Sequence, residues 1–280
     1  MNKTAVALGT FDGLHKGHIE VLKRALSFGK EAIAVTFKVP PKAYFEKEIL
    51  NIISPEEKEK ALKKMGFSRV VFLDFDKVRD TEPAEFLRDL KEEYNCSAVS
   101  CGFNYRFGKN GAGDTTLLRS FCEENGIKLC VADAVKEGKE VISSTLIRSL
   151  LAKGELERVN DLCVAPFGFA AEVVHGDARG RTIGFPTVNQ NYPKDKAPVK
   201  FGVYKSEITV DGKTYRAITN IGKRPTYKLD YIIAETYIVD FSKDVYGKTA
   251  DLRLLKFIRP EQKLSGIEEL KKHIEIDIKK

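Results

Sequence analysis

A loop rich in glycine and histidine follows the first strand-like run of the sequence. Residues 9–18 read GTFDGLHKGH, with His15 and His18 three positions apart. Glycine lets the backbone turn tightly and approach a ligand, and a helix that begins here offers unpaired N–H groups and its positive dipole end to an anion. Imidazoles on one helix face can donate hydrogen bonds to phosphate oxygens. The segment predicts a nucleotide-phosphate site, and the alternative is a tight turn with two surface histidines.

The spacing within this loop disfavours two common phosphate motifs. The loop lacks the Lys-Ser/Thr ending of a P-loop and the GxGxxG spacing of a dinucleotide-binding turn. A second segment, residues 142–148 (ISSTLIR), places hydroxyls at an expected helix start, with Arg148 one turn inside. Arginine can clamp phosphate oxygens with two hydrogen bonds, although Ser144 or Thr145 could instead serve only as an N-cap.

An aromatic segment lies between these two. Residues 102–108 read GFNYRFG, and aromatic side chains beside arginine and glycine suit a planar aromatic ligand. The alternative is an ordinary aromatic-rich loop. The segment therefore indicates a ligand site only in combination with its neighbours.

A second group of polar residues occurs in the C-terminal half. Residues 175–189 read HGDARGRTIGFPTVN, in which glycines with two arginines suit a flap over phosphates. Thr187 and Asn189 alternate with Val188, so on a strand they face the same side. A hydroxyl and an amide oxygen are hard ligands that suit Mg²⁺, and the alternative for this pair is two solvated polar residues.

The elements that must position these residues change character near residue 163. Strands and helices alternate before it, which predicts an α/β, Rossmann-like domain with a parallel sheet. The expected strands cover residues 5–8, 32–37, 70–73, 98–100 and 127–132. The expected helices cover residues 19–27, 55–65, 83–94, 115–125, 145–152 and 155–162.

The remaining sequence predicts an antiparallel β-barrel and a terminal helix. Strand-like runs cover residues 168–175, 202–210, 213–220, 232–240 and 250–258. Asp211-Gly212 between two of them is a strong hairpin signal, and Pro260 begins a final helix. We therefore predict two domains, residues 1–163 and residues 164–280.

The composition narrows the classes of partner. The chain has 280 residues, 42% of them hydrophobic, and a net charge of +7 spread along its length. This balance suits anionic small molecules, with no nucleic acid and no membrane expected. The five cysteines are expected to be reduced core thiols, and neither a signal peptide nor a membrane span is evident. We expect a cytoplasmic protein that is a monomer or weak homo-oligomer.

The N-terminal motifs resemble those of a known superfamily. HKGH at residues 15–18 resembles the HxGH signature of nucleotidyltransferases, in which the histidines stabilise the triphosphate during in-line attack on the α-phosphorus. ISSTLIR resembles the ISSTxIR motif, whose serine, threonine and arginine contact ATP phosphates. GFNYRFG is similar to the GxDFRFG stretch of bacterial FAD synthetases, on the flavin side of the site. Asn104 replaces the usual aspartate, so an amide but no carboxylate is available there.

The C-terminal motifs resemble riboflavin kinases. Residues 175–189 are similar to the signature HGxxRGRxIGFPTAN, and residues 220–226 to the NxGxRPT loop. Residues 234–241 and 246–247 resemble the ETHxxDF…YG strand, with Tyr237 in place of the common histidine. Glu235 keeps the position of the family's general base; without the resemblance it would be a solvated strand carboxylate.

Together the motifs resemble the bifunctional bacterial riboflavin kinase/FAD synthetase family. The resemblance implies that riboflavin, FMN and ATP are the small-molecule partners, with Mg²⁺ accompanying ATP and FMN and FAD as products. The catalytic residues implied are Glu235, His15, His18 and Arg148. The ATP contacts implied are Gly9, Thr10, Phe11, Gly13, Gly17, Ser143, Ser144, Thr145, Gly176, Arg181, Thr187 and Asn189, of which Thr187 and Asn189 would hold the metal. The flavin contacts implied are Asn104, Tyr105, Arg106, Phe107, Arg224 and Arg259.

Two alternative functions stay open at this point. Because of Asn104, the kinase could be active while adenylylation is impaired. The chain could also be a flavin-binding regulator without catalysis, although Glu235 and both HxGH histidines are retained.

Overall fold

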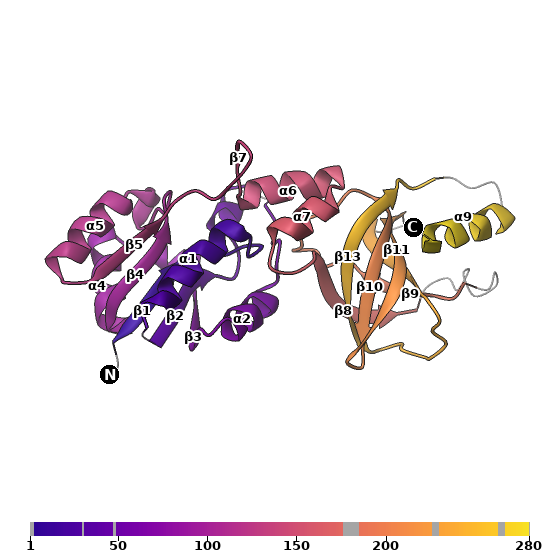
Figure 1. Ribbon diagram of the computed structural model, residues 1–280, viewed down its shortest axis with the longest axis horizontal. Helices are drawn as coiled ribbons and strands as arrows, with labels where there is room; N and C mark the ends of the chain where they lie inside the picture. The colour runs from indigo at the N-terminus through magenta and orange to yellow at the C-terminus, as the bar shows by residue number, and fades with distance from the viewer. Residues whose placement is uncertain are drawn as a thin grey trace. The chain divides into compact units, whose positions relative to one another are not determined.

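A computed structural model of the chain describes residues 3–29, 31–46, 49–175, 185–225, 230–262 and 267–279. The chain divides by its contacts into two units, Met1–Leu146 and Ile147–Lys280 (Figure 1). This division falls inside a helix, and the expected domain boundary after residue 163 stays a prediction. No helix in the described parts of the chain is long and apolar enough to cross a membrane.

A five-stranded parallel sheet forms the centre of the first unit. Its strand order is β3-β2-β1-β4-β5. The chain moves outward from β1 to β3 and then returns to the other side of β1, so the carboxyl ends of β1 and β4 are neighbours where the strand order reverses. The strands are β1 (Thr4–Leu8), β2 (Glu31–Phe37), β3 (Arg69–Leu73), β4 (Cys96–Gly102) and β5 (Lys128–Ala132).

Helices cover both faces of this sheet. Leu87 of α4 and Leu118 of α5 pack with Val6 and Leu8 on one face. Leu22 of α1 and Leu62 of α2 pack with the small residues Ala7 and Ala34 on the other. The helices are α1 (Lys16–Ser27), α2 (Pro55–Lys64), α3 (Phe75–Val78), α4 (Pro83–Tyr94) and α5 (Thr115–Glu124), and a short ribbon pairs β6 (Lys136–Glu137) with β7 (Glu140–Val141). The expected α/β architecture is confirmed.

A closed antiparallel barrel forms the second unit (Figure 1). Its order is β10-β11-β12-β9-β8-β13, with β13 also paired to β10. Asp211 and Gly212 both have positive φ, 51° and 74°, as the expected hairpin turn requires. The strands are β8 (Gly168–Val174), β9 (Thr187–Asn191), β10 (Gly202–Val210), β11 (Lys213–Pro225), β12 (Asp230–Ile238) and β13 (Thr249–Arg259). The expected barrel is confirmed.

Three helices flank the barrel strands in sequence. They are α6 (Ser144–Lys153), α7 (Leu156–Leu162) and α9 (Ile267–Lys279). Asn160 of α7 donates to the carbonyl of Leu254 at 2.9 Å and accepts the N–H of Phe167 at 2.9 Å, which ties α7 to β13. The expected terminal helix is present as α9, but its expected start at Pro260 is wrong, because residues 260–262 are not helical.

Candidate active sites

The loop between β1 and α1 has an unusual backbone. Phe11, Gly13 and Leu14 have φ values of 48°, 89° and 43°. Positive φ is strained for bulky residues, so the surroundings must hold it in place. Phe11 and Leu14 are each only 1% exposed, which shows that their side chains anchor the loop in the core. Backbone strain of this kind concentrates at functional sites.

Asp12 joins this loop to two other segments. Its buried carboxylate accepts the N–H groups of Ile52 at 2.8 Å and Ile53 at 3.3 Å. Its carbonyl oxygen accepts the hydroxyl of Ser144, at the start of α6, at 2.8 Å. The first and second sequence motifs are therefore brought together.

Thr10 is held from inside the fold. Its carbonyl oxygen accepts hydrogen bonds from the hydroxyl of Thr36 at 2.8 Å and from Nζ of Lys58 at 2.9 Å. Neither donor was among the expected site residues. A signal for Lys58 exists in the sequence: it lies four residues before Leu62, on the buried face of α2.

The two histidines lie at the start of α1. Nδ1 of His15, the N-cap, accepts the N–H of His18 at 3.4 Å. The imidazole rings stack with centroids 3.6 Å apart, and Phe11 meets His18 edge-on. Burial lowers the pKa of His15 to about 4. Burial, and then the charges of His15 and Lys58, hold the pKa of His18 well below 6.5. Both imidazoles are therefore neutral at pH 7 and can donate from one ring nitrogen each.

The hydroxyls of the second motif have separate roles. The N-cap of α6 is Ser143, whose Oγ accepts the N–H of Leu146 at 3.2 Å, rather than Ser144 or Thr145. Ser144 donates to the phosphate loop as described above, and Thr145 is exposed at the helix start. Arg148 is half-buried one turn further along α6.

The aromatic segment leaves β4 beside the phosphate loop. Asn104 and Arg106 are exposed, and Arg106 lies 3.7 Å from the carboxylate of Asp114. Tyr105 stacks on Phe107 with centroids 5.8 Å apart, and burial raises the pKa of Tyr105. Phe107 is 5% exposed and belongs to the core of the unit. Its position favours a structural role, and its expected flavin contact stays a prediction.

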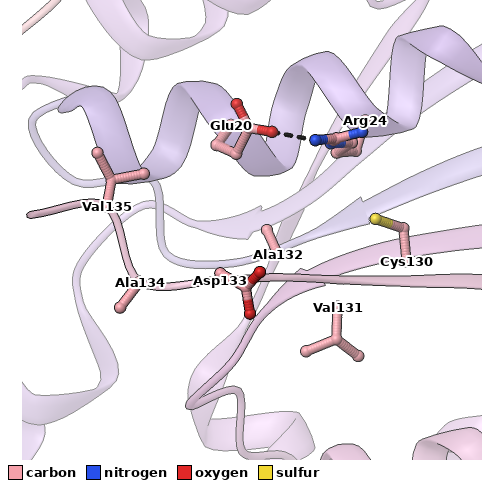
Figure 2. Close-up of a pocket in the computed structure, with 8 residues that line it drawn as sticks. All are labelled: Glu20, Arg24, Cys130, Val131, Ala132, Asp133, Ala134 and Val135. Carbon is pink, nitrogen blue, oxygen red and sulfur yellow. Dashed lines mark hydrogen bonds and ion pairs between the residues drawn. The ribbon is translucent and has the colours of Figure 1, made fainter.

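A cavity of about 410 Å³ opens between α1 and the end of β5. Figure 2 shows Glu20 and Arg24 on the helix, joined by an ion pair at 2.8 Å, with Asp133 on the segment below. Cys130, Val131 and Ala132 of β5 and the two residues after Asp133 complete the lining. The sequence motifs include none of these residues, because neither their types nor their spacing is distinctive until the fold brings them together.

Glu235 lies between two amides in the barrel. In the strand register Glu235 of β12 is opposite Asn220 of β11 on one side and Asn189 of β9 on the other. Paired residues project from the same face of a sheet, so the three side chains form one transverse row. Oδ1 of Asn189 and Oδ1 of Asn220 are both buried, and neither has a hydrogen-bond partner among the residues that the structure describes. Nδ2 of Asn220 donates to Glu261 at 3.1 Å. Glu261 was not among the expected site residues, and Asn220 was expected only as the first residue of the NxGxRPT-like segment.

Thr187 lies on the same face of β9 as Asn189. It is opposite Tyr237 of β12 in the register. Gln190, on the other face, is completely buried and donates to the carbonyls of Ala171 and Ala250 at 2.8 Å each. The alternation expected for Thr187 and Asn189 is therefore present in the strand.

Four of the expected residues need separate comment. Gly176 and Arg181 lie outside the described residues, as does the side chain of Arg224, whose backbone belongs to β11. Arg259 makes an ion pair with Asp277 of α9 at 2.9 Å. This pairing ties β13 to α9 and gives Arg259 a structural role.

The cysteines and acidic residues that the structure describes form no metal site. Within residues that the structure describes, no group of three or more His, Cys, Asp or Glu side chains could hold a metal ion. All five cysteines are free thiols. Burial raises the pKa of Cys101 to about 12 and that of Cys122 to about 11, so these two thiols are unreactive at neutral pH.

Comparison with known proteins assigns a family to each half of the chain. Residues 1–146 match the FAD synthetase family, and residues 164–280 match the riboflavin kinase family. The bifunctional riboflavin kinase/FMN adenylyltransferase of Listeria monocytogenes is 33% identical over 97% of this chain and 89% of its own length. That of Bacillus subtilis is 32% identical over 98% and 90%.

A solved structure covers nearly the whole chain as well. A protein of Streptococcus pneumoniae, named as a macrolide-efflux protein, is 30% identical, covers 99% of this chain and 93% of its own, and has a TM-score of 0.90. That likeness supports the fold. The two family matches and the relatives that cover nearly the whole chain support the function. The chain therefore belongs to the family of bifunctional riboflavin kinases/FMN adenylyltransferases.

Proposed function

We propose that the chain makes FAD in two steps, phosphorylating riboflavin in its barrel and adenylylating FMN in its N-terminal unit. ATP is the second substrate of both reactions, and the intermediate FMN is the product of the first and a substrate of the second. Membership in the bifunctional family supports both activities. Two separate groups of polar residues, one in each unit, support two separate sites.

The observation that carries the kinase is the row of Asn220, Glu235 and Asn189. Glu235 accepts the proton of the ribityl 5′-hydroxyl as its oxygen bonds to the γ-phosphorus. The bond between that phosphorus and the bridging oxygen of ADP breaks in line, and ADP leaves. The two amides beside Glu235 hold the substrates in register with the carboxylate, so positioning supplies much of the rate.

Thr187 and Asn189 would hold Mg²⁺ that accompanies ATP. Their hydroxyl and amide oxygens are the hard ligands that Mg²⁺ prefers. The fit is supported by Oδ1 of Asn189, which is buried, has no hydrogen-bond partner within the described part of the chain and is therefore available as a ligand. When bound, the ion would neutralise phosphate charge. The two residues would orient the triphosphate toward Glu235.

The stacked histidines at the start of α1 carry the adenylyltransferase. A phosphate oxygen of FMN attacks the α-phosphorus of ATP, the bond to the β-phosphate oxygen breaks, and pyrophosphate leaves. FMN phosphate is already anionic, so no strong base is needed. The N–H groups of the loop, the two imidazoles and Arg148 would stabilise the triphosphate. Asn104, Tyr105 and Arg106 would contact the flavin beside the reversal of strand order.

The direct test is to incubate the chain with riboflavin, ATP and Mg²⁺ and to separate the flavin products. Both FMN and FAD are expected, and FMN without any FAD would refute the adenylyltransferase half. If FAD then forms only with the Asn104→Asp variant, adenylylation is impaired in this chain and the kinase is its main activity. Tight flavin binding without turnover would favour the regulator instead.

The cellular setting follows the same proposal. Riboflavin, FMN and ATP are small molecules of the cytoplasm, so we propose that the chain works there as a monomer or weak homo-oligomer. Gel filtration with light scattering tests the second part.

A further inference from the structure

Lys58 is a buried cation that neither proposed reaction uses. Its side chain projects from α2 and is 1% exposed. Nζ donates to the carbonyl oxygen of Thr10 at 2.9 Å and to that of Phe37 at 2.8 Å. The cation therefore ties the strained phosphate loop to the end of β2.

A purely structural role explains this lysine poorly. Burying a charge is unfavourable, and an apolar side chain of similar volume would avoid that penalty. The carbonyl of Thr10 also has a second donor, the hydroxyl of Thr36. Burial lowers the pKa of Lys58 to about 8, while the nearby carboxylate of Asp12 opposes this shift. Lys58 is therefore still mostly protonated at pH 7, and the fold keeps a positive charge where stability alone does not require one.

The charge of Lys58 lies close enough to act on His18. After burial, the charges of His15 and of Lys58 are what hold the pKa of His18 low. Asp12 acts in turn on Lys58, so the charged and titratable groups linked to His18 come from the loop and from α2. A cation near a neutral imidazole increases the attraction for an anion bound over the loop.

We propose that Lys58 is a positioning residue of the adenylyltransferase site, which holds the phosphate loop through Thr10 and keeps a fixed positive charge beneath that loop for the bound triphosphate. This inference rests on the proposed adenylylation of FMN. The charge would act on the triphosphate through the loop and the histidines, without direct contact.

The first test compares Lys58→Met with Lys60→Met. Both substitutions are in α2, but Lys60 is exposed and serves as the matched control. In Lys58→Met we expect kcat/KM of adenylylation to fall at least about tenfold, and part of this fall should come from a higher KM for ATP. Lys60→Met should be unchanged, and phosphorylation of riboflavin by the barrel should be unchanged in both.

The second test measures the imidazoles directly. The chain has four histidines, so their titration can be followed by NMR. The midpoint of His18 should move up toward 6.5 in Lys58→Met and stay in place in Lys60→Met. Lys58→Gln keeps a donor for the Thr10 carbonyl but removes the charge, and it provides the same comparison if the methionine variant does not fold. Thr36→Val removes the other donor and should leave the His18 midpoint unchanged.

The outcomes separate this inference from the proposed function. If the wild-type chain makes no FAD, the proposed adenylylation fails, while the imidazole titration still decides whether Lys58 acts on His18. If the wild type makes FAD and the Lys58 variants match it, the inference is overturned. It is also overturned if the variants only reduce the folded fraction, with the same KM, pH profile and His18 midpoint in the molecules that remain folded.

Discussion

The imidazole ring of His18 stacks on that of His15, with centroids 3.6 Å apart and planes 20° from parallel. Two protonated rings in this arrangement would repel each other inside a buried site. Burial already lowers the pKa of His15 to about 4 and holds that of His18 well below 6.5. The pair is therefore a neutral donor pair, and its neutrality links the stability of the N-terminal unit to pH.

We expect this unit to lose stability as the pH falls from about 6.5 toward about 4. In this window the unfolded chain binds a proton on His15 that the folded chain excludes, so the free energy of unfolding falls with pH. Above 6.5 both states are neutral at His15, and the residue contributes no pH dependence. At pH 5 the loss from His15 alone should be about 2 kcal/mol. Urea unfolding at pH 7 and pH 5 measures it.

The comparison for this prediction is His15→Gln, which cannot titrate. Carboxylates elsewhere contribute equally to both proteins, so the difference between their losses of unfolding free energy measures the contribution of His15. The variant should lose about 2 kcal/mol less than the wild type between pH 7 and pH 5. Equal losses in both proteins would contradict the assigned burial of His15.

The fold was largely predictable because its signals are local. Ser54 and Glu57 form the expected capping box of α2, and Asp211-Gly212 forms the expected hairpin turn. The parallel sheet follows from alternating strands and helices joined by right-handed crossovers, which are general rules. The site residues that the sequence did not predict depend on long-range contacts. Asn220 meets Glu235 only through the register of β11 and β12, and Lys58 reaches Thr10 across 48 positions in sequence.

The contacts in the structure favour a structural role for two residues that were expected to contact the flavin. Phe107 has the residue type of a stacking platform, but the close approach of Gly113 lets its ring enter the core: a Cβ at Gly113 would lie 2.5 Å from the ring. Arg259 has the residue type of a phosphate or flavin contact, but its guanidinium forms an ion pair with Asp277, which comes later in the chain in α9. Residue type alone does not distinguish these structural uses from contact with a ligand.

Glu235→Gln should abolish the kinase without affecting the adenylyltransferase. Loss of a general base lowers turnover by roughly 100- to 10,000-fold. Phosphorylation of riboflavin is measured directly, and adenylylation is measured with FMN supplied. The matched control is Glu172→Gln, an exposed carboxylate on β8, which should retain both activities. Parallel loss of both activities in Glu235→Gln would contradict two separate sites.

Asn189→Ala should change the Mg²⁺ requirement more than the stability. In the ranges that the structure describes, its Oδ1 has no hydrogen-bond partner, so its removal leaves none of their polar groups unsatisfied. We expect the Mg²⁺ concentration for half-maximal kinase activity to rise about tenfold or more, as is usual when groups of a metal site are lost. The thermal midpoint of the barrel should change little.

Gln190, the neighbour of Asn189, should show the opposite pattern: a loss of stability without a change in the Mg²⁺ requirement. Gln190→Ala removes two buried hydrogen bonds to the carbonyls of Ala171 and Ala250. It should destabilise the barrel by about 1–3 kcal/mol while leaving the Mg²⁺ requirement of the folded protein unchanged. A Mg²⁺ requirement that is unchanged in Asn189→Ala would refute Asn189 as a ligand.

Gly17→Ala should lower adenylylation without lowering stability. A Cβ at this position would lie 3.2 Å from Cε1 and Nδ1 of His15 and 3.3 Å from the carbonyl oxygen of Ile142. The added methyl group would therefore push on the stacked ring, while alanine in place of glycine favours the helix by up to about 1 kcal/mol. We expect adenylylation to fall several-fold and the unfolding midpoint of the N-terminal unit to be unchanged or raised. Full activity in the variant would show that the ring position tolerates displacement.

Asp277→Asn should destabilise the barrel as strongly as Arg259→Met. The side chains of Arg259 and Asp277 are 15% and 2% exposed, and their atoms are 2.9 Å apart. Breaking a buried pair leaves one charge uncompensated, which costs about 3 kcal/mol or more. Thermal unfolding measures the loss, and KM for riboflavin in the folded variants tests for flavin contact. Lys256→Met, which removes an exposed ion pair with Glu157, is the control and should cost less than about 1 kcal/mol. A rise in KM that is confined to Arg259→Met, without the matching loss of stability in Asp277→Asn, would assign Arg259 to the flavin and not to the anchoring of α9.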